Sequence, residues 1–247
     1  MKRFITMLVM STIAFMACKK EPVITLTSDA TMPYTYEGGA GTITYTLEDP
    51  SVEVTATCAQ DWITDITVGD QITFNVAENK ENEAREATIA VAYGNLGFDV
   101  KVTQEGSPYI KFVAAHLDGN YYGKQFSDYN NYYVALSDNG FDAEENGLPN
   151  STYFYFDMYS ATPNSTSDIV IPNGVYNLDL DDSQTANTFG NSWSRMSTTN
   201  EEGKSKSKVS YSEGTVTVTS EGIEALLETE NGEKYRVVYE GAPVIDK

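Results

Sequence analysis

Residues 62–106 read WITDITVGDQITFNVAENKENEAREATIAVAYGNLGFDVKVTQEG, and this stretch decides the fold class. Three runs within it alternate apolar and polar residues: Ile72–Val76, Thr88–Ala92 and Phe98–Val102. A period of two places successive side chains on opposite faces, so each run is expected to be a strand with one buried face. The polar run Glu78–Glu86 is expected to be a solvated connection.

Trp62 stands at the edge of this strand series, where a two-layer sandwich needs a large apolar side chain between its sheets. We interpret it as a core residue rather than a ligand platform. Cys58 lies in a strand-like run and is interpreted as a small packed residue. A catalytic cysteine would also need a histidine close by, and the sequence contains a single histidine, His116, so a Cys58–His116 pair is not favoured.

Five short motifs follow one another along the first half of the chain: Glu37–Gly41, Trp62-Ile63, Phe74–Asn79, Arg85–Ile89 and Val102–Gly106. In order and spacing they resemble the BACON family, the Bacteroidetes-associated carbohydrate-binding often N-terminal domain. The resemblance implies an immunoglobulin-like β-sandwich in an exported Bacteroidetes protein. It transfers no sugar-contacting residue, because the matching positions are those that build the fold.

The chain begins with a basic segment and an apolar run, which predict a signal peptide over residues 1–17. Phe15–Cys18 resembles a bacterial lipobox, which implies lipid attachment at Cys18 and anchoring by several acyl chains. The alternative is plain secretion with Cys18 removed. Residues 18–33 are expected to form a tether. The expected location is the outer membrane, on a surface or periplasmic face that the sequence leaves open.

Composition excludes some partners. The formal net charge is −20, from 36 acidic and 16 basic residues. This charge argues against nucleic acid, whose phosphates require Lys and Arg, and against an anionic polysaccharide. No long window has the apolar period of a core helix, so the fold class is all-β. The 17 tyrosines are concentrated in the second half of the chain.

Ser107-Pro108 ends the last strand of the first domain, so the expected domains are residues 34–106 and 107–247. Turn residues in the second domain, such as Glu213-Gly214 and Asn231-Gly232, predict sequential hairpins that close as an antiparallel sandwich or barrel. The expected strands of this domain are Tyr132–Ser137, Thr152–Ser160, Gly174–Leu180, Thr188–Ser197, Ser205–Ser212, Thr215–Thr219, Ile223–Thr229 and Lys234–Tyr239.

The strand Thr152–Ser160 alternates aromatic residues on both faces. Tyr153, Tyr155 and Tyr159 share one face and form a candidate ladder for stacking a glycan chain. The alternative is a central strand buried on both sides.

A second tyrosine cluster, Tyr121-Tyr122 with Tyr129 and Tyr132-Tyr133, is interleaved with Asp and Asn. We interpret it as a polar binding loop, with tyrosines covering a barrel end as the alternative. Trp193, flanked by small polar residues, is the tryptophan expected to contact a ligand.

Catalytic and metal-binding patterns are weaker. The acidic loop Asp138–Asn146 lacks the spacing of a calcium hand, and Asp181-Asp182 is interpreted as a turn. With 36 acidic residues the sequence nominates no carboxylate pair for a glycosidase. We therefore predict a non-catalytic protein that requires no metal or cofactor.

The expected function is a lipid-anchored cell-envelope protein that binds glycans or assists a glycan-utilisation system. Its expected partners are a polysaccharide or proteins of a surface complex, with membrane contact only through the lipid anchor. A structural or adhesive protein that binds protein partners is the alternative, and a glycoside hydrolase is a third, less favoured reading.

Overall fold

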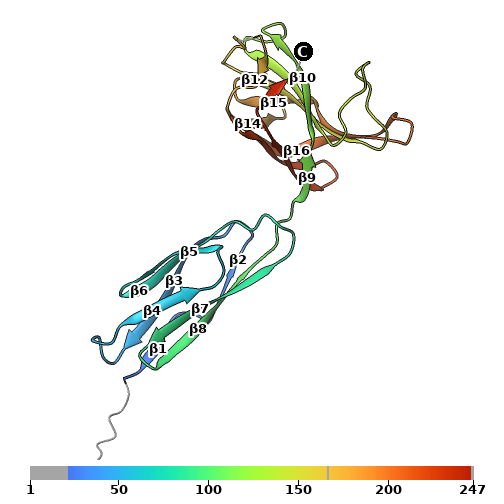
Figure 1. Cartoon of the computed structure of the whole chain (residues 1–247). Helices are drawn as coiled ribbons and strands as arrows, with labels where there is room; N and C mark the ends of the chain where they lie inside the picture. The colour runs from blue at the N-terminus through green and yellow to red at the C-terminus, as the bar shows by residue number, and fades with distance from the viewer. Residues whose placement is uncertain (1–21, 166, 246–247) are drawn as a thin grey trace, which may run out of the picture. The chain divides into compact units, whose positions relative to one another are not determined.

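The computed structural model describes residues 22–165 and 167–245, and this part of the chain is all-β (Figure 1). The predicted signal peptide and Cys18 lie outside the described residues. The chain divides into two compact units. Unit 1 runs to Glu78 and includes Arg85–Gln104, and unit 2 comprises Asn79–Ala84 and the chain from Glu105 onwards. Within the described ranges, no helix is long and apolar enough to cross a membrane.

Unit 1 is a sandwich of two four-stranded sheets with the orders β1-β3-β6-β5 and β2-β8-β7-β4. The three alternating runs of the sequence are confirmed as strands, one in the first sheet and two in the second. The strands are β1 Ile24–Leu26, β2 Thr31–Tyr34, β3 Gly39–Leu47, β4 Val54–Cys58, β5 Ile63–Val68, β6 Gln71–Val76, β7 Arg85–Tyr93 and β8 Leu96–Gln104.

The inner faces of these two sheets form the core of unit 1. In β7, Ala87, Ile89 and Val91 are buried and the residues between them are exposed, as the period of two predicts. Trp62 packs against this core, and the Arg85 guanidinium carbon lies 4.4 Å from its ring centroid. The ring is only partly buried, so Trp62 lies at the margin of the core rather than between the sheets, where the sequence placed it.

Unit 2 is built on a nine-stranded sheet with the order β10-β11-β12-β15-β14-β16-β17-β18-β9, in which β15 also pairs directly with β16. A separate two-stranded sheet joins β13 to β19. The strands are β9 Ile110–Ala114, β10 His116–Gly123, β11 Asn130–Ser137, β12 Thr152–Ser160, β13 Ile169–Val170, β14 Gly174–Asp179, β15 Thr188–Thr199, β16 Ser205–Thr219, β17 Gly222–Thr229, β18 Lys234–Glu240 and β19 Val244–Ile245.

The large sheet curls around a single core. Phe154 of β12 lies 4.9 Å from Phe112 of β9 and 5.4 Å from Tyr235 of β18, measured between ring centroids. β12 is third in the sheet order, whereas β18 and β9 are the last two strands, so the two ends of the sheet face each other. Its edge strands β9 and β10 are separated only by Ala115. Of the two expected architectures, the curled sheet is closer to a barrel.

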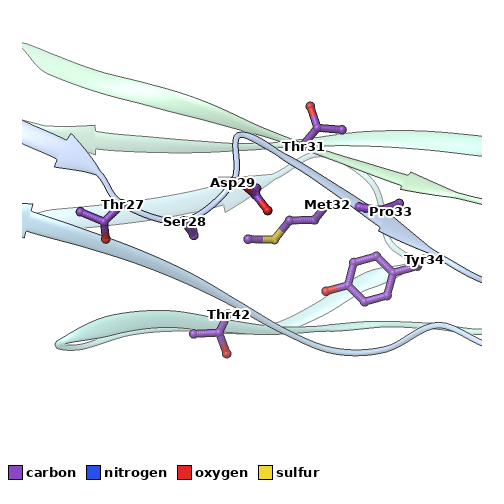
Figure 2. Close-up of a pocket in the computed structure, with 8 residues that line it drawn as sticks. All are labelled: Thr27, Ser28, Asp29, Thr31, Met32, Pro33, Tyr34 and Thr42. Carbon is purple, nitrogen blue, oxygen red and sulfur yellow. The ribbon is translucent and has the colours of Figure 1, made fainter.

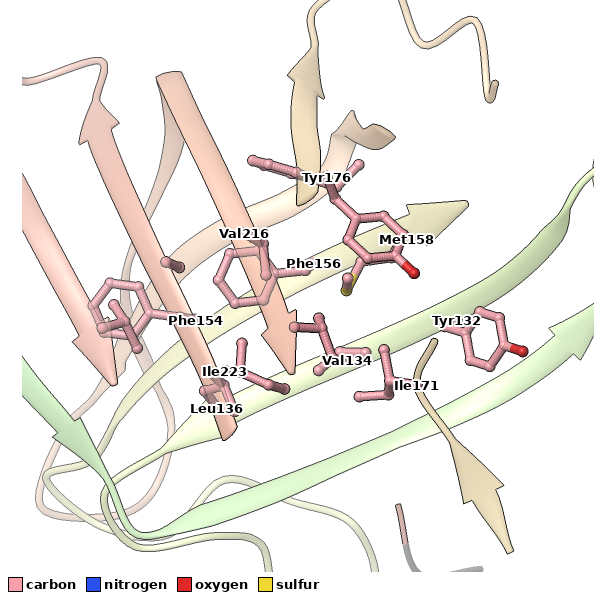
Figure 3. Close-up of a cluster of buried hydrophobic side chains, with 14 of the residues drawn as sticks. Tyr132, Val134, Leu136, Phe154, Phe156, Met158, Ile171, Tyr176, Val216 and Ile223 are labelled. Carbon is pink, nitrogen blue, oxygen red and sulfur yellow. The ribbon is translucent and has the colours of Figure 1, made fainter. Parts of the chain in front are cut away.

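Figure 3 shows the inner face of this curled sheet. Phe154, Phe156 and Met158 are fully buried, and Tyr132 and Val134 of β11 lie beside them. The small β13–β19 sheet contributes Ile169 and Ile245 to the same cluster. The core therefore uses one complete face of the large sheet, and the opposite face of β12 remains to be explained.

Four features differ from the sequence-based expectation. Residues 22–33, expected to belong to the tether, contain β1 and most of β2, which are strands of the unit 1 sandwich. The pairs β14–β15 and β18–β9 are parallel, so the large sheet is not wholly antiparallel. The aromatic segment expected to be a loop is mostly the hairpin β10–β11, with only residues 124–129 as its connection. The turn expected at Glu213-Gly214 is absent, because β16 runs straight through it with a bulge. A Cβ at Gly214 would lie 2.8 Å from Leu227 Cδ2, so this glycine serves close packing rather than a turn.

Candidate functional site

Four neighbouring strands of unit 2, β10, β11, β12 and β15, carry the candidate site on their outer face. The register pairs Tyr133 of β11 with Asn120 of β10 and with Asp157 of β12. Two residues further along, Asn131 pairs with Tyr159. Because alternate residues of a strand share a face, these side chains point away from the core.

This face contains a cavity of about 470 Å³, which we call the aromatic pocket. Its rim is formed by Tyr122, Phe126 and Trp193, and its floor by Asn131, Tyr133, Asp157, Tyr159, Gln184 and Arg195.

Among the described residues of unit 2, the three rim residues are the exposed Phe, Trp and Tyr side chains. Trp193 is 64% exposed, Phe126 56% and Tyr122 40%. The rings of Tyr122 and Phe126 meet edge to face with centroids 5.4 Å apart. Large apolar side chains gathered at a cavity and left open to solvent are typical of a binding surface.

Trp193 projects from a bulge in β15. Asp157 of β12 pairs with Gly190 of β15, but Tyr155, its neighbour on the same face, pairs with Arg195. Four residues of β15 therefore lie opposite one residue of β12 and loop away from the sheet. The bulge carries the indole ring out over the pocket.

Asp157 supplies the carboxylate of the floor and is only 7% exposed. Its Oδ1 accepts a hydrogen bond from Asn131 Nδ2 at 2.7 Å, and its Oδ2 accepts one from Tyr159 Oη at 2.8 Å. Its backbone N–H donates to Ser194 Oγ at 2.9 Å. Burial raises the pKa of Asp157 above its ordinary value, while the two side-chain bonds oppose that rise. The group is fixed in place and keeps lone pairs for ligand hydroxyls.

A loop in an uncommon backbone conformation places a second carboxylate beside Asp157. Asp182 and Gln184 have φ angles of 48° and 55°, in the left-handed region. Ser192 donates its backbone N–H to Asp182 Oδ1 at 3.1 Å and its hydroxyl to Oδ2. A Cβ at Gly190 would lie 2.7 Å from Asp182 Oδ1 and 3.4 Å from Asp157 Oδ2. A side chain at Gly190 would therefore crowd both carboxylates.

The three tyrosines of the expected ladder do not form one exposed platform. Tyr153 is 1% exposed, because its ring packs 4.8 Å from Phe141 and its hydroxyl donates to the Gly140 carbonyl at 2.8 Å. Tyr159 is 2% exposed and reaches the pocket only as part of its floor. Tyr155 is half-buried. β12 is thus largely buried on both sides, which is the alternative interpretation of its sequence.

The adjacent tyrosines Tyr121 and Tyr122 point to opposite faces of β10. Tyr121 packs against the core, 4.8 Å from Tyr132, and its hydroxyl donates to Asn130 Oδ1 at 2.9 Å. Tyr122 lies on the rim of the aromatic pocket. Of the two, the structure therefore brings only Tyr122 to the candidate site, together with Trp193.

A second hollow, of about 550 Å³, lies in unit 1 beside β2 and β3 (Figure 2). Its hydroxyl groups are partly used within the protein: Thr27 Oγ1 donates to Thr44 Oγ1 at 2.8 Å, and Ser28 Oγ accepts from the Thr44 backbone at 3.2 Å. The Tyr34 ring packs edge-on against Phe74, with centroids 6.4 Å apart. This hollow offers no free ring comparable to Trp193 and fits a ligand less well.

Metal ligands are not gathered in the described part of the chain, where no group of three or more His, Cys, Asp or Glu side chains is placed to hold a metal ion. In the acidic loop, Asp142 Oδ1 accepts bonds from the backbone of Asn146 at 2.8 Å and of Glu144 at 3.0 Å. These bonds, chiefly the one from Asn146, lower the pKa of Asp142. The Asp142 carboxylate therefore bonds to the backbone of its own loop.

Comparison with known proteins identifies part of unit 1. Residues 52–105 match the BACON family model. That model is described as "Putative binding domain, N-terminal". The match confirms the resemblance in that segment and includes none of the residues of the aromatic pocket. No curated protein sequence matches the chain.

Similar solved structures include a Bacteroides ovatus GH5 xyloglucanase in complex with a XXXG heptasaccharide, at 17% identity and a TM-score of 0.30 over 36% of this chain. The chain spans only 21% of that enzyme. The adhesin InvE of Yersinia pseudotuberculosis is similar at 14% identity and a TM-score of 0.26, over 89% of this chain and 58% of InvE. The titin I9–I11 tandem is similar at 8% identity and a TM-score of 0.26, over 90% of this chain and 66% of the tandem. Likenesses this low carry no information on function.

Several pocket residues were not singled out from the sequence. Asp157 stands in an aromatic strand, and its outward direction follows from the alternation of β12, which was applied only to the tyrosines. Arg195 and Gln184 carried no sequence signal, because their positions depend on the β15 bulge and on the left-handed loop. Phe126 was also missed, and Asn131 and Tyr133 were identified only as part of a polar loop.

Proposed function

We propose that unit 2 binds a neutral glycan in the aromatic pocket and catalyses no reaction on it. Sugar rings present flat C–H faces that stack on aromatic rings, and their hydroxyl groups bond to carboxylate and amide groups. The observation that carries the proposal is the arrangement of three exposed rings around Asp157, whose carboxylate is held by Asn131 and Tyr159.

The BACON match supports a role in a glycan-related system, because carbohydrate binding is the function that the family's name carries. The aromatic pocket lies outside the matched segment. In this proposal unit 1 is a spacer and unit 2 contacts the glycan.

The proposal includes export and lipid attachment at Cys18, on the strength of the lipobox-like residues 15–18. Cys18→Ser is expected to move the protein from the membrane fraction to the soluble fraction. Metabolic labelling with palmitate should mark the wild type and not the variant. Equal labelling of both proteins would contradict attachment at Cys18.

Affinity electrophoresis of the mature chain tests the binding function. Gels containing neutral polysaccharides, such as xylan, mannan, xyloglucan and β-glucan, are expected to retard the wild type in at least one case. Retardation in none of a broad panel of plant and host glycans would overturn the proposal and would favour a protein partner on the same surface.

The absence of catalysis is tested with the glycan that is bound. Asp157 and Asp182 approach each other near Gly190, so a hydrolytic activity is the outcome to exclude. Both carboxylates already accept hydrogen bonds from protein groups, and no release of reducing ends is expected over prolonged incubation. Their appearance, and their loss in Asp157→Asn, would show a glycosidase instead.

A further inference from the structure

Unit 2 has a further pocket of about 380 Å³, distinct from the hollow in unit 1, which we call the second pocket. It continues the outer face of unit 2 beyond the aromatic pocket. The two pockets share Tyr133 and Arg195. Tyr133 stacks with Tyr155, with ring centroids 5.8 Å apart and planes 19° from parallel. The Arg195 guanidinium carbon lies 4.9 Å from the centroid of Tyr155. These flat groups make a continuous floor from one pocket to the other.

The register of β12 sets the length of this floor. Tyr155, Asp157 and Tyr159 are successive outward residues of the strand. Tyr155 lines the second pocket, and the other two line the aromatic pocket. Residues two apart on a strand are about 7 Å apart, so the floor extends about 14 Å along β12. That distance exceeds the width of one sugar ring.

The charges of the second pocket indicate the class of ligand. Asp118, Asp142 and Glu145 line it, and Arg195 is its one basic residue. Arg195 lies on the Tyr155 ring and donates from Nη1 to the carbonyl of Trp193 at 3.1 Å, so part of its bonding capacity is used internally. The balance repels a carboxylate or sulfate group and supplies acceptors for hydroxyls.

We propose that the two pockets are adjacent subsites of one groove, which holds a neutral oligosaccharide laid along β12. This inference rests on the proposed function, because it assigns successive units of the same glycan to the two pockets. The aromatic pocket stacks one unit against its exposed rings. The second pocket takes the next unit through Phe141 and its carboxylates.

Calorimetry on the mature chain, with neutral oligosaccharides of increasing length, tests the inference. The probes are the xylo-, manno- and cello-oligosaccharide series from monosaccharide to hexasaccharide, with oligogalacturonate as the anionic comparison. Occupation of a second linked subsite is expected to raise affinity at least about tenfold from the shortest to the longest member of the bound series. Oligogalacturonate is expected to bind at least about tenfold more weakly than the neutral series.

Two variants separate the subsites. Asn120 is exposed and lines only the second pocket, so Asn120→Trp is expected to fill that pocket without entering the other. Its affinity for a hexasaccharide should fall to that of the short ligand, and its affinity for the short ligand should be unchanged. Phe141→Leu removes the aromatic ring from the second pocket and keeps an apolar side chain there. This variant should also lose affinity for the hexasaccharide and keep its affinity for the short ligand.

The outcomes distinguish this inference from the proposed function. If a mono- or disaccharide binds as tightly as the hexasaccharide, and the binding depends on Trp193, the second subsite is wrong and the proposed function stands. If no sugar of any length binds, both fail. Tight binding of oligogalacturonate would overturn the assignment of a neutral ligand.

Discussion

Truncating Trp193 to alanine is expected to weaken glycan binding about thirtyfold while leaving the fold intact. Trp193 is 64% exposed, so its ring adds little to the core. A tryptophan side chain presents about 250 Å², and a sugar stacked on one open face covers about 80 Å² of it. At about 25 cal/mol per Å² that contact stabilises the complex by ~2 kcal/mol. This energy corresponds to roughly a thirtyfold change in dissociation constant.

Calorimetry on the wild type and two variants measures the effect. The matched control is Val113→Ala, because Val113 is 60% exposed on β9 and lines neither pocket. Both variants are expected to melt within about 2 °C of the wild type, since substitutions at exposed positions change stability little. Only Trp193→Ala should lose affinity. An affinity within threefold of the wild type would refute stacking on Trp193.

Three further predictions concern the floor of the pocket and the core beneath it. Burial raises the pKa of Asp157 in the folded state above the ordinary value of about 3.9, which applies to the unfolded state. At pH values between the ordinary pKa and the raised pKa, the folded state therefore binds more protons than the unfolded state. Stability should therefore fall as pH rises through that window. Asp157→Asn is expected to remove that fall in thermal melts taken from acid to neutral pH, and an unchanged pH profile would exclude Asp157 as its source. Tyr211 Oη is buried and has no hydrogen-bond partner among the residues that the structure describes, whereas Tyr176 Oη donates to the Pro172 carbonyl at 2.8 Å. Tyr211→Phe is thus expected to stabilise unit 2 by about 1 kcal/mol and Tyr176→Phe to destabilise it by about 1 kcal/mol, and equal losses by denaturant unfolding would show that Tyr211 has an internal partner. Gly190→Ala is expected to lower both the melting temperature and the glycan affinity, because its Cβ would displace the Asp182 carboxylate. A variant with the melting temperature and affinity of the wild type would show that the Asp182 loop moves aside at no cost.

The strands of unit 2 were largely predictable from local alternation. Thr152–Ser160 has the expected bounds, and its alternation places Phe154, Phe156 and Met158 together on the face that is buried in the core. β10 was missed because Asp118 and Asn120, interleaved with Gly119, are typical of turns. Their outward face forms the groove, which is why the segment is polar.

The site was predictable only in part, because its exposure depends on contacts distant in sequence. Trp193 stood out by its small polar neighbours, and the structure places it on the pocket rim. The burial of Tyr153 depends on the loop that carries Phe141, and no alternation within β12 encodes that cover. Likewise, the hydrogen bonds that fix Asp157 come from Asn131 on a different strand.

Tryptophan fluorescence of a Trp62→Phe variant tests the central claim most directly. The chain contains two tryptophans, so in this variant all tryptophan emission comes from Trp193. Titration with the glycan that retards the protein in gels is expected to shift this emission to the blue, because the sugar removes water from the ring. The shift should saturate with the dissociation constant that calorimetry gives. An emission that stays constant while calorimetry records binding would place the glycan elsewhere and contradict the assignment of the aromatic pocket.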